Sequence, residues 1–160
     1  MLQFPSRKPN RIKGYDYSQS GYYFITICIA DKRKILWHPS ADNVGAAIGR
    51  PKLSEIGKVV DEAVAGISNH YECVNVDKHV IMPNHIHLIL TIKNDNELLR
   101  PPAISTIINQ MKGHVTKQLG YSIWQKLFHD HVIRHEAEYQ KIWQYIDNNP
   151  QKWNEDMYFS

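Results

Sequence analysis

The chain alternates between two periods of apolar and polar positions, and these periods divide it into seven elements. Segments in which every second side chain is apolar, or in which aromatic and β-branched residues gather as in GYYFITICIA, predict strands. Segments in which apolar side chains recur every three or four residues predict helices. The predicted elements are strand 21–30, helix 53–67, strand 72–82, strand 85–92, helix 103–119, strand 126–134 and helix 136–148.

Glycine and proline residues mark the ends of several of these elements. Pro83 and Asn84 predict a tight turn that joins two strands into a hairpin. Gly120 follows the second helix, as expected of a helix end, and Pro150 is expected to end the last helix. Residues 1–20 are mostly polar and predict an irregular basic arm.

The order β-α-β-β-α-β-α predicts an α+β fold. Four strands and two helices in this order match the ferredoxin-like split βαβ pattern, here followed by a C-terminal helix. The pattern forms an antiparallel sheet with helices packed on one face, and we expect the other face to be free to bind a ligand. A chain of 160 residues has the usual length of one domain, so we expect a single domain over residues 1–160.

Composition excludes several classes of protein. With 42% hydrophobic and 22% charged residues, the chain is expected to be globular rather than disordered. No apolar run approaches the roughly 18–20 residues of a membrane span, so we expect no membrane partner. The start of the chain, MLQFPSRKPNR, lacks the apolar stretch of a signal peptide, and the two cysteines, Cys28 and Cys73, lie inside predicted strands. We therefore expect a cytoplasmic protein without disulfides.

The net charge of +3 is small, but basic residues cluster on either side of the first strand. Arg7, Arg11 and Lys13 precede that strand, and the run KRK at residues 32–34 follows it. Many such clusters are only solvated surface, and the alternative is a rim that contacts phosphate groups. Charge alone does not distinguish the two.

Candidate chemistry lies in the second strand of the hairpin, HIHLILTI. Side chains alternate across a strand, so His85 and His87 are expected on one face and Ile86 on the other. Two imidazoles in this arrangement can bind one divalent cation, and the alternative is two histidines bonded to their neighbours. His129 and His131 have the same spacing in a more polar segment, so we favour the first pair.

The last predicted helix supplies two further candidates. Tyr145 lies at the edge of the apolar stripe of this helix, and Asn149 lies one turn further along the same surface. A boundary tyrosine and an asparagine before a proline are both common, so the pattern leaves their roles open. The expected buried stripe consists of Tyr139, Ile142, Trp143 and Ile146.

Four motifs follow one another along the chain: RIKGYDYSQSGYYFITI, HIHLIL, HDHVIR and YIDNNP. In this combination the chain resembles the single-tyrosine HUH transposases, and most of all the REP-associated tyrosine transposases. The resemblance covers nearly the whole chain. It implies a metal-dependent nuclease and strand transferase that acts on single-stranded DNA, often beside hairpins.

The resemblance also implies roles for individual residues. His85, His87 and Asn149 would be the ligands of a divalent metal, Mg²⁺ or Mn²⁺. Tyr145, on the C-terminal helix, would be the nucleophile and would form a 5′-phosphotyrosine link with the cut strand. The candidate DNA-binding residues are Arg7, Arg11, Lys13, Lys112 and Arg134.

Two other functions stay open at this point. One is a metal-dependent phosphodiesterase in which activated water attacks the phosphate instead of the tyrosine. The other is a DNA-binding regulator that has the same fold and no catalytic activity. A covalent protein–DNA adduct is expected only from the transposase. The sequence is compatible with a homodimer and with a monomer.

Overall fold

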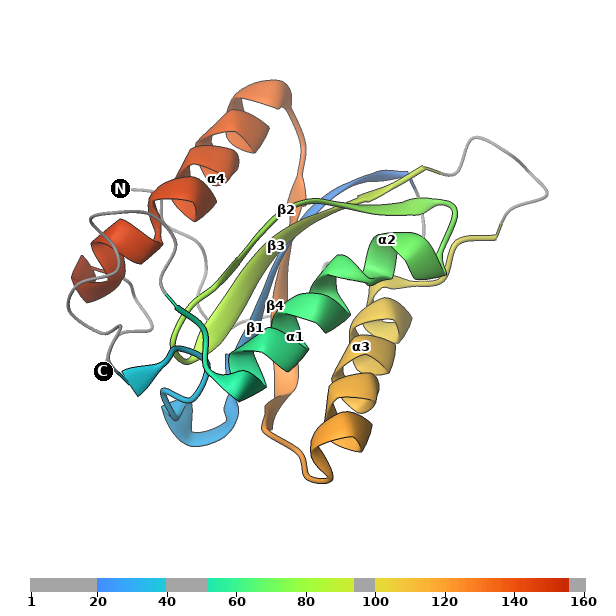
Figure 1. Ribbon diagram of the computed structural model, residues 1–160. Helices are drawn as coiled ribbons and strands as arrows, with labels where there is room; N and C mark the ends of the chain where they lie inside the picture. The colour runs from blue at the N-terminus through green and yellow to red at the C-terminus, as the bar shows by residue number, and fades with distance from the viewer. Residues whose placement is uncertain (1–19, 40–51, 94–99, 156–160) are drawn as a thin grey trace.

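The computed structural model describes residues 20–39, 52–93 and 100–155, and they form a four-stranded antiparallel sheet with helices on both faces (Figure 1). The strand order is β2-β3-β1-β4. The strands are β1 (Gly21–Ile29), β2 (Val74–Ile81), β3 (His85–Ile92) and β4 (Trp124–Ile133). The helices are α1 (Glu55–Ala65), α2 (Ile67–His70), α3 (Ile104–Leu119) and α4 (Glu136–Asn148), with 3-10 segments η1 (Ala30–Lys32) and η4 (Pro150–Glu155).

The predicted α+β, ferredoxin-like order is confirmed, with differences at the ends of elements. The helix predicted over 53–67 is divided, since α1 ends at Ala65 and α2 begins at Ile67. Helix α4 ends before Pro150, as expected, but a further helical segment, η4, begins at Pro150 itself. Most of the predicted arm, with Arg7, Arg11 and Lys13, lies outside the described residues.

The two crossover helices share one face of the sheet, as predicted, and α4 lies on the opposite face (Figure 1). The expectation that this second face is free is therefore wrong. Phe24, Ile89 and Ile133 of the sheet pack against Ile142 and Ile146 of α4. The apolar stripe of α4 is the physical reason, since such a stripe is stabilised by packing against another apolar surface.

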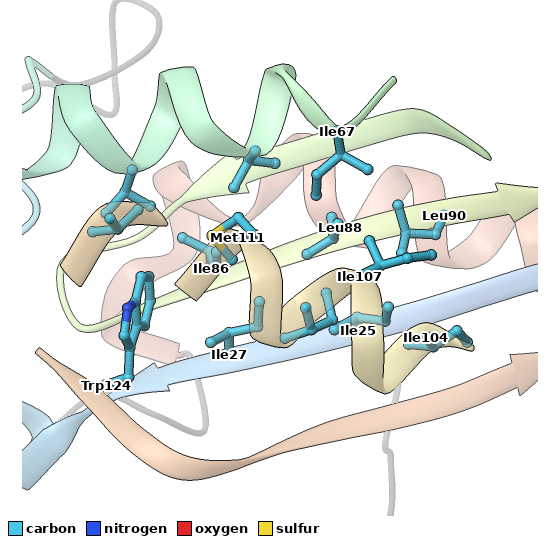
Figure 2. Close-up of a cluster of buried hydrophobic side chains, with 14 of the residues drawn as sticks. Ile25, Ile27, Ile67, Ile86, Leu88, Leu90, Ile104, Ile107, Met111 and Trp124 are labelled. Carbon is cyan, nitrogen blue, oxygen red and sulfur yellow. The ribbon is translucent and has the colours of Figure 1, made fainter. Parts of the chain in front are cut away.

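The larger apolar cluster lies between the sheet and helices α1 and α3. Ile86, Leu88 and Leu90 of β3 point into it together with Ile25 and Ile27 of the neighbouring β1 (Figure 2). Each fully buried side chain of this kind contributes about 1.5–3 kcal/mol to folding. All eight residues of β3 are buried, which explains why its sequence shows no simple apolar-polar alternation.

Two expectations drawn from composition can be compared with the described residues. Cys28 and Cys73 form no disulfide with each other within the described residues. None of the helices in the described ranges is long and apolar enough to cross a membrane.

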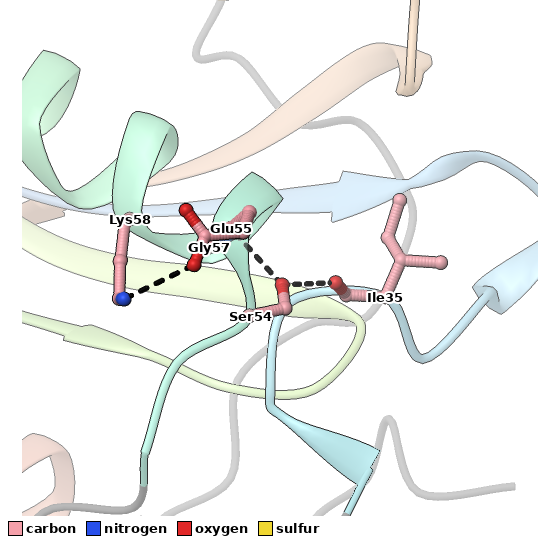
Figure 3. A network of polar contacts seen from close by, with 5 residues as sticks. All are labelled: Ile35, Ser54, Glu55, Gly57 and Lys58. Atoms are coloured by element: carbon pink, nitrogen blue, oxygen red, sulfur yellow. Dashed lines mark hydrogen bonds and ion pairs between the residues drawn. The ribbon is translucent and has the colours of Figure 1, made fainter.

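The start of α1 is held against the chain that follows η1 (Figure 3). Ser54 caps the helix, since its Oγ accepts a hydrogen bond from the Gly57 N–H (2.9 Å) and donates one to the Ile35 carbonyl (2.6 Å). The Ser54 N–H donates to the Leu36 carbonyl (3.0 Å). A Cβ atom at Gly57 would collide with this Leu36 oxygen, so position 57 has no space for a side chain.

We expect Gly57→Ala to lower the free energy of unfolding by about 1–3 kcal/mol, the usual cost of overpacking. Gly113→Ala is the matched control, because a Cβ there meets nothing within 4 Å. Alanine is favoured over glycine inside a helix by up to about 1 kcal/mol, so the control is expected to be as stable as wild type or slightly more stable. Urea unfolding measures the stability of both variants. Equal unfolding midpoints would contradict the close approach of the Leu36 carbonyl to Gly57.

Candidate metal centre

His85 and His87 project from β3 toward α4, and their rings converge. Both side chains are buried, with 0% and 1% of their surface exposed. The two Nε2 atoms lie 3.1 Å apart, although same-face positions of a strand are separated by about 6–7 Å. The predicted placement on one face is thus confirmed, and Ile86 lies in the cluster on the other face.

The Nδ1 atom of each imidazole lies against a different polar side chain. His85 Nδ1 is 2.7 Å from Oδ1 of Asn84, which lies in the turn between β2 and β3. His87 Nδ1 is 2.8 Å from Oγ1 of Thr26, which lies directly opposite His87 on β1. These contacts orient the rings so that the Nε2 atoms face each other.

Residues of α4 and η4 cover the histidine pair. The ring of Tyr145 lies 5.4 Å from the His87 ring, between centroids, and 6.2 Å from the Phe24 ring in an edge-to-face arrangement. The ring of Trp153 lies 6.0 Å from the His85 ring. Tyr145 is half-buried against the sheet, as expected of a residue at the edge of the helical stripe.

Asn149 lies at the C-terminal cap of α4, and in sequence it falls between Tyr145 and Trp153, the two aromatic residues that contact the histidines. Its side chain is 4% exposed, and no group in the described part of the chain donates a hydrogen bond to its Oδ1. A buried amide oxygen left without a partner costs about 1–3 kcal/mol. An oxygen of this kind is a suitable ligand for a hard cation such as Mg²⁺ or Mn²⁺.

The side chains present fit one divalent cation. Two ligands about 2.1 Å from one cation lie about 3 Å apart when they meet at a right angle, close to the observed separation of the two Nε2 atoms. Within residues 20–39, 52–93 and 100–155, no three side chains of the His, Cys, Asp or Glu types gather as a metal-ligand group. Among the described residues a third protein ligand would therefore be a side chain of another type, and the amide oxygen of Asn149 is the one that the resemblance implied.

At the β4 edge of the sheet, a histidine from the alternative pair holds the start of α4. His131 Nε2 lies 2.9 Å from Glu138 Oε2, and the Arg134 N–H donates to Glu138 Oε1 (3.0 Å). Burial alone would raise the pKa of Glu138, but the hydrogen bonds from His131 and Arg134 lower it overall. His131 thus binds a carboxylate of α4 in this structure.

At the β2 edge, two further contacts fix α4. Tyr139 donates a hydrogen bond to Asp77 Oδ2 (2.7 Å), which also accepts one from Thr91 (2.6 Å). Lys78 forms an ion pair with Asp147 at 2.7 Å. Burial, followed by the hydrogen bond to Asp77, raises the pKa of Tyr139 above its ordinary value. Helix α4 is therefore attached to both edges of the sheet that it covers.

The basic candidates lie in different places. Lys112 belongs to α3, on the other face of the sheet, where its Nζ donates to the Gln125 carbonyl (2.9 Å) and burial lowers its pKa. Arg134 is exposed at the opposite end of α4 from Asn149. Lys34, from the KRK run, is exposed and has its Nζ 5.9 Å from the centre of the Trp153 ring. Of these three, Lys34 lies beside Trp153, whose ring in turn contacts His85.

The sequence pattern did not indicate a role at this centre for several of its residues. Thr26 is a polar side chain within an apolar strand, and Asn84 was interpreted only as a turn residue. Trp153 follows Pro150, where no helical segment was expected. A hydroxyl in the middle of a buried strand was an available signal, because such a group needs a hydrogen-bond partner.

Comparisons with known proteins agree with this fold. No protein-family model matches the chain. An uncharacterized protein of Haemophilus influenzae is 30% identical to it, over 96% of this chain and 93% of that protein. Another H. influenzae protein, named "Putative REP-associated tyrosine transposase", is 24% identical over 86% of this chain and 74% of its own length. A solved REP-associated tyrosine transposase bound to a REP hairpin has a TM-score of 0.60 and 19% identity, covering 96% of this chain and 74% of its own.

The sheet order and the placement of α4 define the class of fold. The chain has the fold of the REP-associated tyrosine transposases, as its motifs indicated. It belongs to one family with the H. influenzae protein to which it is 30% identical.

The attachment of α4 predicts a particular loss of stability at alkaline pH. The pKa of Tyr139 is raised in the folded protein, so its protonated hydroxyl contributes to the free energy of unfolding. This contribution is complete below about pH 10, the ordinary tyrosine pKa, and is lost as the pH rises further. Urea unfolding between about pH 8 and pH 11 should therefore show a steeper decline for wild type than for Tyr139→Phe. Tyr121→Phe, at an exposed tyrosine, should follow wild type. Identical slopes in all three proteins would contradict the raised pKa.

Proposed function

We propose that the protein cleaves single-stranded DNA beside hairpins and transfers the cut strand through covalent attack by Tyr145. The observation that carries the proposal is the contact between the Tyr145 ring and a buried, convergent histidine pair. A tyrosine next to a pair of potential metal ligands fits phosphoryl transfer better than simple DNA binding. The relative solved in complex with a REP hairpin supports hairpin DNA as the partner.

His85, His87 and Asn149 would hold the divalent cation, Mg²⁺ or Mn²⁺. When bound, such a cation neutralises charge on the phosphate and makes the phosphorus more electrophilic. The protein's own contribution is to hold the two imidazoles in fixed orientations and to place aromatic side chains, Phe24 and Trp153, around them. Lys34, beside Trp153, would contact the DNA backbone.

The proposed chemistry forms one bond and breaks another. The phenolic oxygen of Tyr145 bonds to phosphorus, and the bond from phosphorus to the 3′ oxygen of the preceding nucleotide breaks. The tyrosine loses its proton and the 3′ oxygen gains one, which leaves a 5′-phosphotyrosine and a free 3′-OH. Attack of a 3′-OH on this link reverses the step, so strand joining needs no additional energy source. A phenol has a pKa near 10 and needs activation to react at neutral pH.

Two alternatives predict different products. A phosphodiesterase that uses activated water would cut the DNA without any covalent adduct. A DNA-binding regulator would bind the hairpin and leave it intact with either metal. Labelled hairpin DNA with a single-stranded flank, incubated with Mn²⁺ and resolved on a denaturing gel, separates all three.

Tyr145→Phe is expected to abolish adduct formation and to preserve folding and DNA affinity. The change removes one oxygen and keeps the ring that contacts His87 and Phe24. The adduct assay above measures the effect, and Tyr121→Phe serves as the control because Tyr121 is half-exposed and lies outside the centre. Undiminished cutting by Tyr145→Phe would favour attack by water.

Asn149→Ala is expected to raise the Mn²⁺ concentration needed for half-maximal cleavage. Stability should change by at most about 1 kcal/mol, because no hydrogen bond to Oδ1 is lost among the described residues. Asn149→Gln should recover part of the activity, since it keeps an amide oxygen on a longer side chain. Titration of Mn²⁺ against the cleavage rate compares the three proteins. Superimposable curves would exclude Asn149 from the metal centre.

A further inference from the structure

The two histidines of the metal centre have different kinds of partner at Nδ1, and this difference has a chemical meaning. The amide oxygen of Asn84 only accepts hydrogen bonds, whereas the hydroxyl of Thr26 both donates and accepts. Both side chains are almost completely buried, with 2% and 4% exposed. Each partner is also fixed in place, since the Asn84 carbonyl accepts from the Ile29 N–H (2.9 Å) and Thr26 is a β-branched residue inside β1.

The Asn84 contact determines where neutral His85 carries its hydrogen. Because Asn84 Oδ1 accepts at 2.7 Å, His85 donates from Nδ1 and keeps a lone pair on Nε2. His87 Nε2 lies 3.1 Å from that lone pair, at hydrogen-bond distance. In the cation-free protein His87 therefore carries its hydrogen on Nε2 and donates it to His85.

A cation bound by both imidazoles requires the other form of His87. Lone pairs are then needed on both Nε2 atoms, so the single hydrogen of neutral His87 must reside on Nδ1. Thr26 Oγ1, 2.8 Å from this Nδ1, accepts that hydrogen in the cation-bound form and donates its own in the cation-free form. The proton count of His87 is the same in both forms, and the Thr26 hydroxyl keeps its hydrogen and only rotates.

We infer that Thr26 is a positioning residue that allows His87 to exchange tautomers when the cation binds, while Asn84 keeps His85 in one tautomer. The inference rests on the proposed metal-dependent function. It assigns the exchange to Thr26 because its hydroxyl, at hydrogen-bond distance from His87 Nδ1, can both donate to and accept from this nitrogen while the ring stays in place. Valine at position 26 has nearly the same shape and can do neither.

The test combines ¹⁵N NMR of the imidazoles with Mg²⁺ binding measured by calorimetry. In wild type, His87 should carry hydrogen on Nε2 without cation and on Nδ1 with saturating Mg²⁺, while His85 stays protonated on Nδ1 throughout. Thr26→Val should weaken Mg²⁺ binding about 10- to 100-fold, the usual cost of losing a partner of a metal-bound histidine. Thr26→Ser should restore both the exchange and most of the affinity.

Thr91→Val is the matched control, because Thr91 is a similarly buried threonine of β3 whose hydroxyl bonds Asp77 instead of a histidine. It should bind Mg²⁺ as wild type does. The inference is overturned if Thr26→Val binds Mg²⁺ within about twofold of wild type, or if His87 carries its hydrogen on Nδ1 before cation is added. A wild-type protein that binds no Mg²⁺ and forms no adduct would instead overturn the proposed function. Whether or not the protein binds Mg²⁺, the cation-free ¹⁵N spectra test the assigned tautomers of His85 and His87.

Discussion

Burial of β3 on both faces is the constraint on which the rest of the structure depends. One face carries only apolar side chains toward α1 and α3, whereas the other presents His85 and His87 toward α4. A buried imidazole without partners is costly, since its donor and its acceptor both lose contact with water. The neighbouring turn and the neighbouring strand each supply one polar partner, and the remaining nitrogens are directed at each other.

The proposed site is complete only when the last helix is packed on the sheet. The histidines belong to the central hairpin, whereas Tyr145 and Asn149 come from the end of the described chain. Apolar packing holds α4 against the sheet, and polar contacts at the β2 and β4 edges set its position across the strands. Apolar side chains thus hold α4 on the sheet and polar side chains set its position. A substitution in one set can therefore weaken its role and leave the role of the other set intact.

Much of the architecture could be predicted from the sequence because each element has a clear period. The strand at 85–92 was located to the residue, and the shared face of His85 and His87 follows from the alternation of a strand. The face covered by α4 could not be predicted, since a stripe such as Ile142 and Ile146 indicates that a helix is buried and does not indicate against what.

The candidate centre was predictable only in part, for a related reason. Periodicity locates a residue within its own element, and the roles of Thr26 and Trp153 depend on contacts between elements distant in the chain. Strand register brings Thr26 opposite His87, and the helical segment after Pro150 brings Trp153 to His85. Neither relation is visible in a single stretch of sequence.

The segment after η1 connects the two sides of the molecule through its backbone. The Leu36 N–H donates to the Pro83 carbonyl (3.0 Å), in the turn that holds Asn84, and the Leu36 carbonyl accepts from Ser54 at the start of α1. A displacement at Gly57, on the face remote from the histidines, would reach that turn through a single residue. In a mutational scan for activity, substitutions at position 57 would therefore lower activity as substitutions in the centre do, although Gly57 takes no part in the chemistry. Their loss of folding stability would distinguish them from substitutions of the histidines.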